Sequence, residues 1–195
     1  MSRNILTQYQ WSMNSNKKTN GCANGSANSL AKHSQLWLDA GCGGNKQPNC
    51  VGMDKRRLPG VDVVHDIETV PWPFHAEMFD RVILSHVMEH INPSKSVDVM
   101  NEIWRIMKPD GVLMLAMPYA GSFGHWQDPT HIKPWNEATC HYFDPEMELY
   151  KIYEPDPWKI EANVWRADGN LEVIFKKRPR RSVPQPAVSG QRSGV

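Results

Sequence analysis

Glycine and acidic residues follow three short apolar runs, in an order that suggests nucleoside recognition. Gly41, Asp54 and Asp66 each come directly or shortly after such a run. A glycine lets the backbone approach a ligand that any Cβ would obstruct. The first carboxylate can accept both hydroxyls of a ribose, and the second can accept from an exocyclic amine while Ile67 covers the base. An isolated acid there is more often a turn former, so the prediction rests on the three together.

The segment His86-Val87-Met88-Glu89-His90 combines two histidines and a glutamate at a spacing that can carry metal chemistry. Taken alone, it is the His-x-x-Glu-His pattern of inverted zinc metallopeptidases, with two imidazoles one helical turn apart. That chemistry needs a long helix and a third ligand, whereas Asn92-Pro93 ends any helix here within about two turns. A zinc metallopeptidase is therefore a remote alternative, and we assign no metal ligand.

Apolar runs separated by turn residues predict a sheet that brings these side chains to one edge. The runs are apolar on both faces, which is typical of parallel strands buried under helices. In such a sheet, ligands sit at the carboxyl ends of the strands, near the point where the strand order reverses. The runs span residues 36–40, 51–53, 61–64, 79–84 and 112–117.

One helix and one hairpin complete the predicted fold. Ser94 or Ser96 can cap the helix, and the turn 108–111 stops it. Asp168-Gly169-Asn170 lies between two strand-like segments and predicts a hairpin. The fold class is therefore α/β, a doubly wound and mostly parallel sheet with a C-terminal antiparallel hairpin. The helix is indicated by the helical spacing of Val97, Met100, Ile103, Trp104 and Met107.

In this order and spacing, the motifs resemble those of class I S-adenosylmethionine-dependent methyltransferases. The resemblance covers about residues 36–118 and implies a Rossmann-like fold, S-adenosylmethionine as cofactor and methyl transfer as the reaction. It is carried by Leu38-Asp39-Ala40-Gly41-Cys42-Gly43, Asp54, Asp66-Ile67 with the turn 71–74, the strand and Glu-His ending of 79–90, and the crossover 102–111. It implies cofactor contacts from Asp39, Gly41, Cys42, Gly43, Asp54, Asp66, Ile67 and Ser85.

The first crossover departs from the usual pattern of this superfamily. Only residues 45–50 separate Gly44 from Val51, where the usual fold inserts a helix. A parallel crossover normally needs a dozen or more residues, so this one is near the minimum length. The chain therefore resembles a compact branch with a shortened first helix.

Residues 118–157 are the predicted substrate-side lid. They are rich in aromatic and histidine residues and show little helical periodicity. His131, oriented by Asp128, is the leading candidate for a general base because histidine titrates near neutral pH. His86, closer to the methyl donor on the strand map, is the second candidate. A hydrogen-bonded turn is an equally good explanation of the segment around His131.

The predicted acceptor is an oxygen or nitrogen of a small molecule or a sugar-like compound. The fourth strand ends in Leu84-Ser85-His86-Val87, not in the Asn/Asp-Pro-Pro-Tyr/Phe segment of enzymes that methylate amino groups of nucleic acids. A non-catalytic cofactor-binding or interaction module of the same fold is the main alternative. The resemblance to ubiquinone-type O-methyltransferases adds another possibility, that His86, Glu89 and His90 hold a divalent cation. The simpler explanation is that Glu89 and His90 orient the loop.

Charge and composition fit these expectations. Residues 39–175 carry 12 basic and 21 acidic residues, a balance that disfavours nucleic acid as the partner. The sequence predicts a flexible segment over 1–34, a methyltransferase-like domain over 35–176 and a basic disordered tail over 177–195. The absence of an export signal, of a membrane span and of Cys-x-x-Cys pairs favours a cytoplasmic protein. The oligomeric state is left open.

Overall fold

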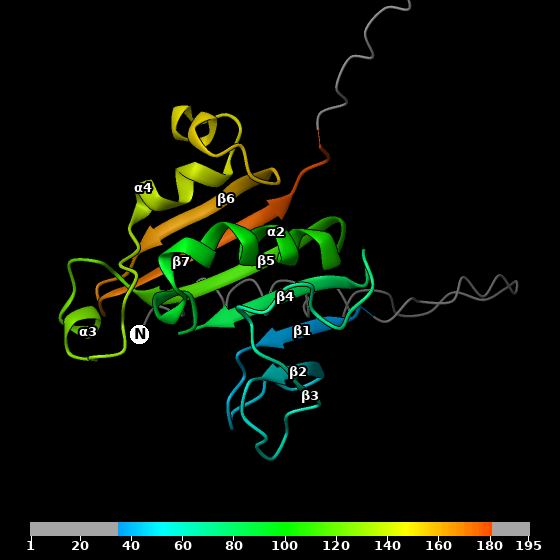
Figure 1. Cartoon of the computed structure of the whole chain (residues 1–195). Helices are drawn as coiled ribbons and strands as arrows, with labels where there is room; N and C mark the ends of the chain where they lie inside the picture. The colour runs from blue at the N-terminus through cyan, green and yellow to red at the C-terminus, as the bar shows by residue number, and fades with distance from the viewer. Residues whose placement is uncertain (1–34, 181–195) are drawn as a thin grey trace, which may run out of the picture.

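A seven-stranded sheet forms the centre of the protein, whose computed structural model describes residues 35–180 (Figure 1). The strands lie in the order β3-β2-β1-β4-β5-β7-β6. The strands β1 to β5 pair in parallel, and β7 pairs antiparallel with both β5 and β6. The predicted fold class is therefore confirmed. The bounds are β1 Trp37–Ala40, β2 Cys50–Asp54, β3 Val63–Val64, β4 Phe79–Ser85, β5 Met107–Pro118, β6 Trp158–Trp165 and β7 Asn170–Lys177.

The direction of the strand order reverses between β1 and β4, because β2 and β3 lie on one side of β1 and β4 and β5 on the other. The register sets Asp39 of β1 beside Gly52 of β2 and Ile83 of β4. Loops that leave the carboxyl ends of these strands therefore diverge at one point, which is where open parallel sheets bind ligands.

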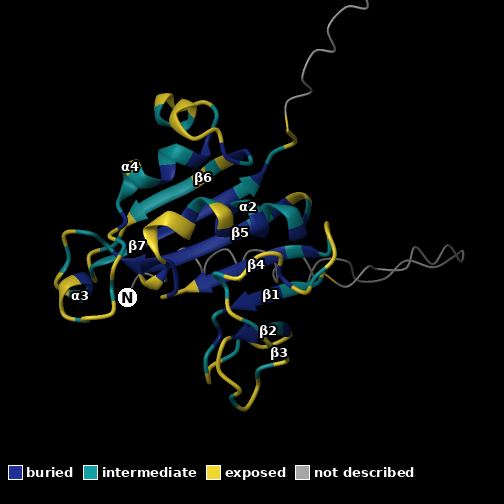
Figure 2. Cartoon of the chain, viewed as in Figure 1, coloured by how far each residue is buried: buried dark blue, intermediate teal, exposed yellow. Residues whose placement is uncertain are grey.

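Helix α2, Ser96–Ile106, crosses one face of the sheet in front of β4 and β5 (Figure 1). Its inward side chains pack into the main hydrophobic core with the central strands, which Figure 2 shows as the most buried part of the molecule. The inward residues are Val99, Met100, Ile103 and Ile106. The other helical elements are short: η1 Met88–His90, η2 Pro93–Lys95, α3 Phe123–Trp126, α4 Glu137–Cys140, η3 His141–Phe143 and η4 Glu148–Ile152.

The start of α2 differs from the prediction. Neither Ser94 nor Ser96 caps it, because Lys95 is the N-cap residue and makes no side-chain capping bond. Instead, Asn92 caps the preceding turn η2 by accepting from the amide of Ser94. A 3-10 turn that leads straight into α2 therefore takes the place of a single capping serine.

The connection from β1 to β2 has no helix and runs over residues 41–49. Asp39, at the end of β1, stabilises this loop because its carboxylate accepts a hydrogen bond from the amide of Gln47 at 2.7 Å. Lys46 anchors the outer side by an ion pair with Asp62 at 2.7 Å. The connection is therefore a short loop without a helix, as the few residues between Gly44 and Val51 predict.

The C-terminal boundary of the fold also needs correction. The sequence predicts a flexible tail from residue 177, yet Lys177 is the last residue of β7 and only 5% exposed. Its ammonium group donates to the carbonyl of Met107 and lies 3.9 Å from the ring centroid of Trp104. The guanidinium carbon of Arg180 lies 4.8 Å from the same ring centroid. Cation–π contacts with Trp104 therefore attach to the fold two basic residues that the sequence places in a flexible tail. The predicted flexible segment 1–34 and the rest of the tail, 181–195, lie outside the described residues.

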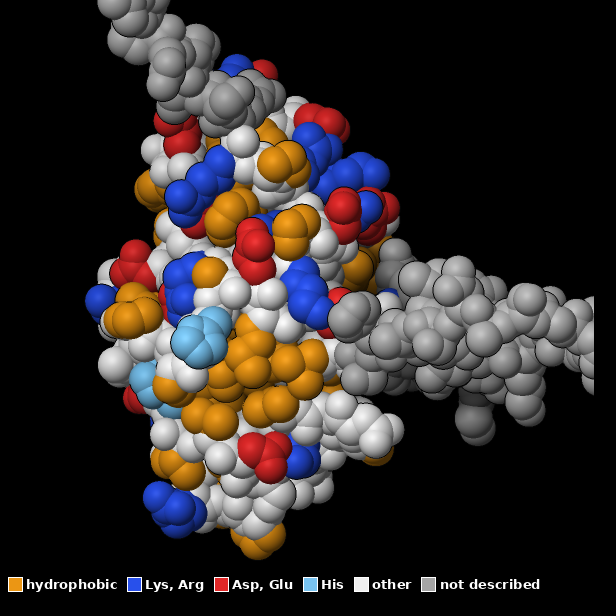
Figure 3. Space-filling model, turned by 90° about the vertical axis from the view of Figure 1, so that its right-hand side faces the viewer, with side chains coloured by type: hydrophobic (Ala, Val, Ile, Leu, Met, Phe, Trp, Pro, Cys, Tyr) orange, Lys and Arg blue, Asp and Glu red, His pale blue; other side chains and the backbone are white. Residues whose placement is uncertain are grey.

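The surface seen in Figure 3 mixes charges of both signs. Lysine and arginine side chains alternate with aspartate and glutamate around a central group of hydrophobic side chains, so this face presents no field of one sign. Within residues 35–180, no helix has the length and apolar character required to cross a bilayer.

Candidate functional site

A cavity of about 520 Å³ opens at the carboxyl edge of the sheet, beside the reversal of strand order. Residues that follow four different strands line it, which is the convergence predicted from the sequence. The loop after β4 and Thr130 of the segment 118–157 complete its wall. The lining residues are Gly41, Met53, Asp54, Lys55, Arg56, His65, Asp66, Ile67, Glu68, His86, Val87, His90, Ile91 and Thr130.

At Gly41 the backbone in this wall packs closely against a neighbouring side chain. Its φ of +75° lies in the left-handed region, and a Cβ built on it would come within 2.4 Å of Cγ2 of Val87. The amides of Gly41 and Cys42 both donate to the carbonyl of Met53, at 2.7 and 3.1 Å. The loop after β1 is therefore folded tightly against the end of β2, in a conformation that only glycine adopts here without strain.

Asp54 closes β2 with a carboxylate that is buried and already hydrogen-bonded. One oxygen, Oδ2, accepts from the amide of Gly43 at 2.9 Å. The other, Oδ1, accepts from the amide and Nε of Arg56 at 2.9 and 3.1 Å. Burial acts to raise the pKa of Asp54, but these hydrogen bonds outweigh it and the pKa is lowered. Asp54 is therefore held as a carboxylate facing the cavity.

Asp66 and Ile67 form the part of the wall that follows β3. Asp66 is exposed, and one of its oxygens accepts from the amide of Glu68 at 3.0 Å. Ile67 is half-buried, and its carbonyl accepts from the indole of the buried Trp72 at 2.9 Å. Trp72 therefore fixes the backbone that presents an apolar side chain and a carboxylate to the same cavity.

His86 stands at the end of β4 in a strained backbone conformation. Its φ is +56°, which is uncommon for a residue with a Cβ and often marks functional positions. Its amide donates to the carbonyl of Ala116 at 2.7 Å, which ties the strained residue to β5. Its Nδ1 lies 3.3 Å from Oε1 of the buried Glu89, and this interaction raises the pKa of His86 against the opposing effect of burial.

The structure brings five of the predicted site residues to the cavity wall: Gly41, Asp54, Asp66, Ile67 and His86. Asp39, Cys42, Gly43 and Ser85 are near neighbours in the chain but do not line it. Asp39 holds the short crossover, and Gly43 holds Asp54. The buried thiol of Cys42 has a raised pKa, chiefly because of desolvation, and stays neutral.

His131 lies behind this wall rather than on it. Its side chain is only 7% exposed, and its Nε2 faces Glu89 at 4.0 Å and Asp128 at 3.8 Å. The predicted pairing with Asp128 is present, but His131 has no place among the residues that line the cavity. His86, the second candidate for a base, is the histidine at the cavity that also carries backbone strain.

Two lining residues, Arg56 and Thr130, are not among the residues predicted from the sequence, and His90, predicted to orient the loop or to hold a cation, also lines the cavity. Arg56 follows Asp54 by two residues, so its position was within reach of local reasoning. Thr130 is held at the wall by contacts with distant residues: the carbonyl of Glu89 accepts from the amides of Ile132 and Lys133, at 2.9 and 3.0 Å, and His90 Nδ1 lies 3.2 Å from the carbonyl oxygen of Thr130. No local pattern indicates that docking.

The family model described as a methyltransferase domain matches residues 21–115. A search of curated proteins finds no match to the chain.

Solved structures share the fold at low sequence identity. A methyltransferase dependent on S-adenosylmethionine from Archaeoglobus fulgidus is 17% identical with a TM-score of 0.54, covering 75% of this chain and 87% of that one. The 1,6-didemethyltoxoflavin-N1-methyltransferase of Burkholderia thailandensis, solved with S-adenosylhomocysteine, is 14% identical with a TM-score of 0.53, covering 74% and 72%. The cyclase SpnF is 15% identical with a TM-score of 0.51, covering 73% and 74%.

Proposed function

Because the chain belongs to the class I S-adenosylmethionine-dependent methyltransferase superfamily by its family match and its fold, we propose that it binds this cofactor at the carboxyl edge of the sheet. We further propose that it transfers the methyl group to an oxygen or nitrogen of a small-molecule or sugar-like acceptor. The observation that carries this proposal is the convergence of Gly41, Asp54, Asp66 and His86 on one cavity.

The residues at the cavity fit the cofactor. Gly41 lines the cavity, and its missing Cβ lets the loop backbone pack directly against Val87, which a side chain there would meet at 2.4 Å. Asp54 Oδ2 accepts one protein hydrogen bond and keeps a lone pair for a ribose hydroxyl. The side chain of Arg56, 62% exposed, can swing away from Oδ1, which then accepts only from the amide of Arg56 and keeps a lone pair for the second hydroxyl. The cavity volume lies in the range of about 300–1,000 Å³ that is usual for small-molecule sites.

The remaining roles follow from the positions of the side chains. Ile67 packs against the base, and Asp66 accepts from its exocyclic amine. The cofactor itself supplies the electrophilic methyl group. The protein aligns the acceptor and removes its proton, for which His86 is the proposed base because its side chain lines the cavity. Since Nδ1 of His86 faces Glu89, Nε2 is the atom that takes the proton.

A small acceptor is favoured by the charges of the surface. The region that carries the fold has an excess of acidic residues, and Figure 3 shows mixed signs rather than a basic stripe. A phosphate backbone needs clustered lysine and arginine to bind. Nucleic acid is therefore not the proposed acceptor.

A non-catalytic role of the same fold is the second candidate function. The ion pair of Arg56 with Asp54 favours it, because Arg56 occupies an oxygen that the ribose would use. The cyclase SpnF also shares the fold, so the architecture alone does not specify methyl transfer. Tight binding of S-adenosylmethionine without turnover on any acceptor supports this candidate.

The test combines binding and turnover on the full chain. Calorimetric titration with S-adenosylmethionine and with S-adenosylhomocysteine measures affinity, and labelled methyl groups are then followed into a panel of hydroxylated and amine acceptors. We expect binding of both cofactor forms and label transfer to at least one acceptor class. Absence of binding to both forms would contradict the proposed function.

A further inference from the structure

We propose that Glu89, His90 and His131 form a binding site for a divalent transition-metal ion, with zinc as the best match. Each residue offers one ligand atom, and the three atoms lie within 4.8 Å of one another. The histidines come from two segments about forty residues apart in the chain, the turn η1 and the segment 118–157. This set differs from the His86, Glu89 and His90 pattern visible in the sequence.

The hydrogen bonds of both histidines leave Nε2 available as a ligand atom. His131 Nδ1 lies 2.8 Å from the carbonyl oxygen of His125. A carbonyl oxygen can only accept, so the proton of His131 sits on Nδ1. His90 Nδ1 likewise lies 3.2 Å from the carbonyl oxygen of Thr130. A backbone carbonyl that fixes the tautomer in this way is the usual support of a metal-binding imidazole.

The same logic extends to the side chain of Thr130. Its hydroxyl donates to Asp128 Oδ1 at 2.7 Å, so towards His90 it acts as an acceptor at 3.1 Å. Asp128 and Thr130 thus form an outer layer that holds the ring of His90 in place. The rings of His90 and His131 are in edge contact, with centroids 4.7 Å apart. Both are therefore held close together beside the same carboxylate.

Glu89 supplies the strongest evidence for a cation. It is fully buried, and neither of its carboxylate oxygens has a hydrogen bond. Nδ1 of His86 and Nε2 of His131 lie at ion-pair distances of 3.3 and 4.0 Å from Oε1, but neither contact meets hydrogen-bond geometry. A buried carboxylate without such bonds is costly, and an ion held between it and the two imidazoles removes that cost.

The ligand types select the class of ion. Two imidazoles and one carboxylate suit zinc and related transition metals, whereas magnesium and calcium prefer ligand sets made of oxygen atoms. Zinc with bonds of about 2.0–2.1 Å brings tetrahedral ligand atoms to about 3.3 Å apart, so ligand atoms now up to 4.8 Å apart approach one another by at most about 1.5 Å on binding. Three protein ligands leave one position open to water or to an acceptor.

An ion at this place joins the segment 118–157 to the end of β4. The backbone of Glu89 already accepts from the amides of Ile132 and Lys133, so the metal adds side-chain bonds to an existing contact. Because His90 and Thr130 also line the cavity, the ion fixes one side of its wall. None of the ligands is assigned to the cofactor, but the site is linked to the proposed base, because Glu89 also faces Nδ1 of His86 at 3.3 Å.

The test measures metal binding by the full chain without a histidine tag. The protein is stripped with a chelator, and zinc is titrated by calorimetry and checked by metal content after dialysis. We expect about one zinc per chain, and substitution with cobalt gives the intense visible absorption of a four- or five-coordinate ion. His131→Gln and Glu89→Gln each weaken zinc binding by at least about tenfold, while His75→Gln, an exposed histidine elsewhere, leaves it unchanged.

Two results would overturn the site. One is wild-type protein that retains no stoichiometric zinc after dialysis. The other is a cobalt complex with the weak spectrum of the hydrated six-coordinate ion, an outcome that needs no variant to fold. Binding of S-adenosylmethionine, measured on the same sample, separates this proposal from the proposed function: cofactor binding without zinc refutes only the metal site.

Discussion

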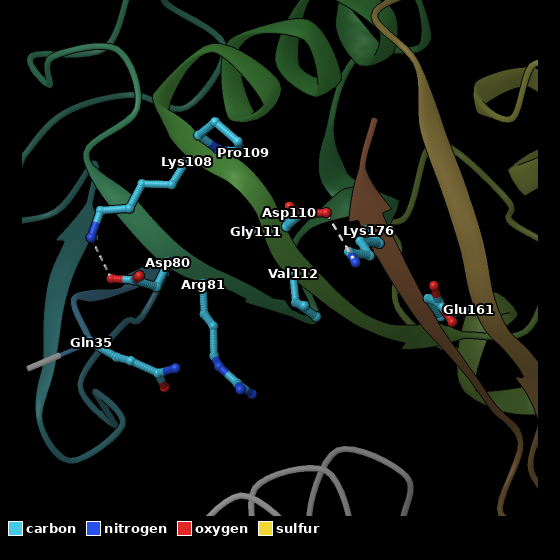
Figure 4. Close-up of a pocket in the computed structure, with 10 residues that line it drawn as sticks. All are labelled: Gln35, Asp80, Arg81, Lys108, Pro109, Asp110, Gly111, Val112, Glu161 and Lys176. Atoms are coloured by element: carbon cyan, nitrogen blue, oxygen red, sulfur yellow. Dashed lines mark hydrogen bonds and ion pairs between the residues drawn. The ribbon is translucent and has the colours of Figure 1, made fainter. Parts of the chain in front are cut away.

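The two edges of the sheet each carry a hollow, and the charged groups in the two hollows are used differently. At the amino edge, a hollow of about 430 Å³ holds charges that neutralise one another (Figure 4). Lys108 pairs with Asp80 at 2.8 Å and Lys176 with Asp110 at 3.0 Å. At the carboxyl edge, His86 and His90 line the cavity, and Glu89 is buried behind its wall without a hydrogen bond.

This difference shows why size alone does not identify a binding site. Opposite charges that pair across a surface hollow stabilise the protein little and leave no group for a ligand. Buried groups without a hydrogen bond are retained where a ligand or an ion later uses them. The carboxyl edge is therefore the functional edge in our account, and the variants below test the contrast.

The largest expected effect is at Asp54. Asp54→Asn removes the charge that accepts the ribose hydroxyls, and loss of two charge-assisted hydrogen bonds costs about 3 kcal/mol, or about a 100-fold weaker Kd for S-adenosylmethionine. Calorimetry measures the Kd. Asp110→Asn, at the amino edge, is the matched control and keeps the wild-type affinity. An equal loss of cofactor affinity in both variants would contradict the claim that the cofactor binds at the carboxyl edge.

Turnover is expected to depend on His86. His86→Asn keeps a side chain that tolerates a positive φ, so it removes the imidazole without relieving the backbone conformation. A lost general base lowers kcat by about 100-fold or more, while the Kd for the cofactor changes little. Steady-state kinetics with an identified acceptor give both values. A parallel fall in kcat and affinity would instead assign His86 a structural role.

The next effect in size concerns the fold of the glycine loop. Gly41→Ala places a methyl group against Val87 at a left-handed position, which is expected to cost about 1–3 kcal/mol of unfolding free energy. Chemical denaturation measures this loss. Gly44→Ala is the control, because a Cβ there meets no atom within 4 Å. Similar losses in the two variants would show that the close approach at Gly41 is unimportant.

The smallest effect is expected from Arg56. Arg56→Gln frees one oxygen of Asp54 and is expected to change the Kd for S-adenosylmethionine by less than about threefold, because the exposed guanidinium contributes little. The same titration decides the matter. A strong gain in affinity would show that Arg56 blocks the ribose site and would favour the non-catalytic candidate.

The strand ends could be predicted from the sequence because their signals are local. Apolar runs followed by Gly41, Asp54 and Asp66 indicated both the strands and the edge at which they meet. The hairpin around Gly169 was equally local, since its turn residues lie between two strand patterns. Local backbone preference and burial periodicity are properties of adjacent residues, and these parts of the fold depend on little else.

The parts that could not be predicted depend on contacts between distant residues. Lys177 and Arg180, near the end of the described chain, make cation–π contacts with Trp104. Basic residues that the sequence predicts to be a flexible tail therefore belong to the fold. His131 was predicted at the acceptor, but the path of the segment 118–157 turns it towards the buried Glu89. Each outcome follows from tertiary packing that no short pattern records.

Hydrogen–deuterium exchange of the full chain with and without S-adenosylmethionine tests the central claim most directly. The account predicts that the cofactor slows exchange in the loops after β1, β2 and β3, around Gly41, Asp54 and Asp66, and leaves residues 108–111 at the start of β5 unchanged. Protection confined to residues 108–111 and to the other residues that line the amino-edge hollow would contradict it.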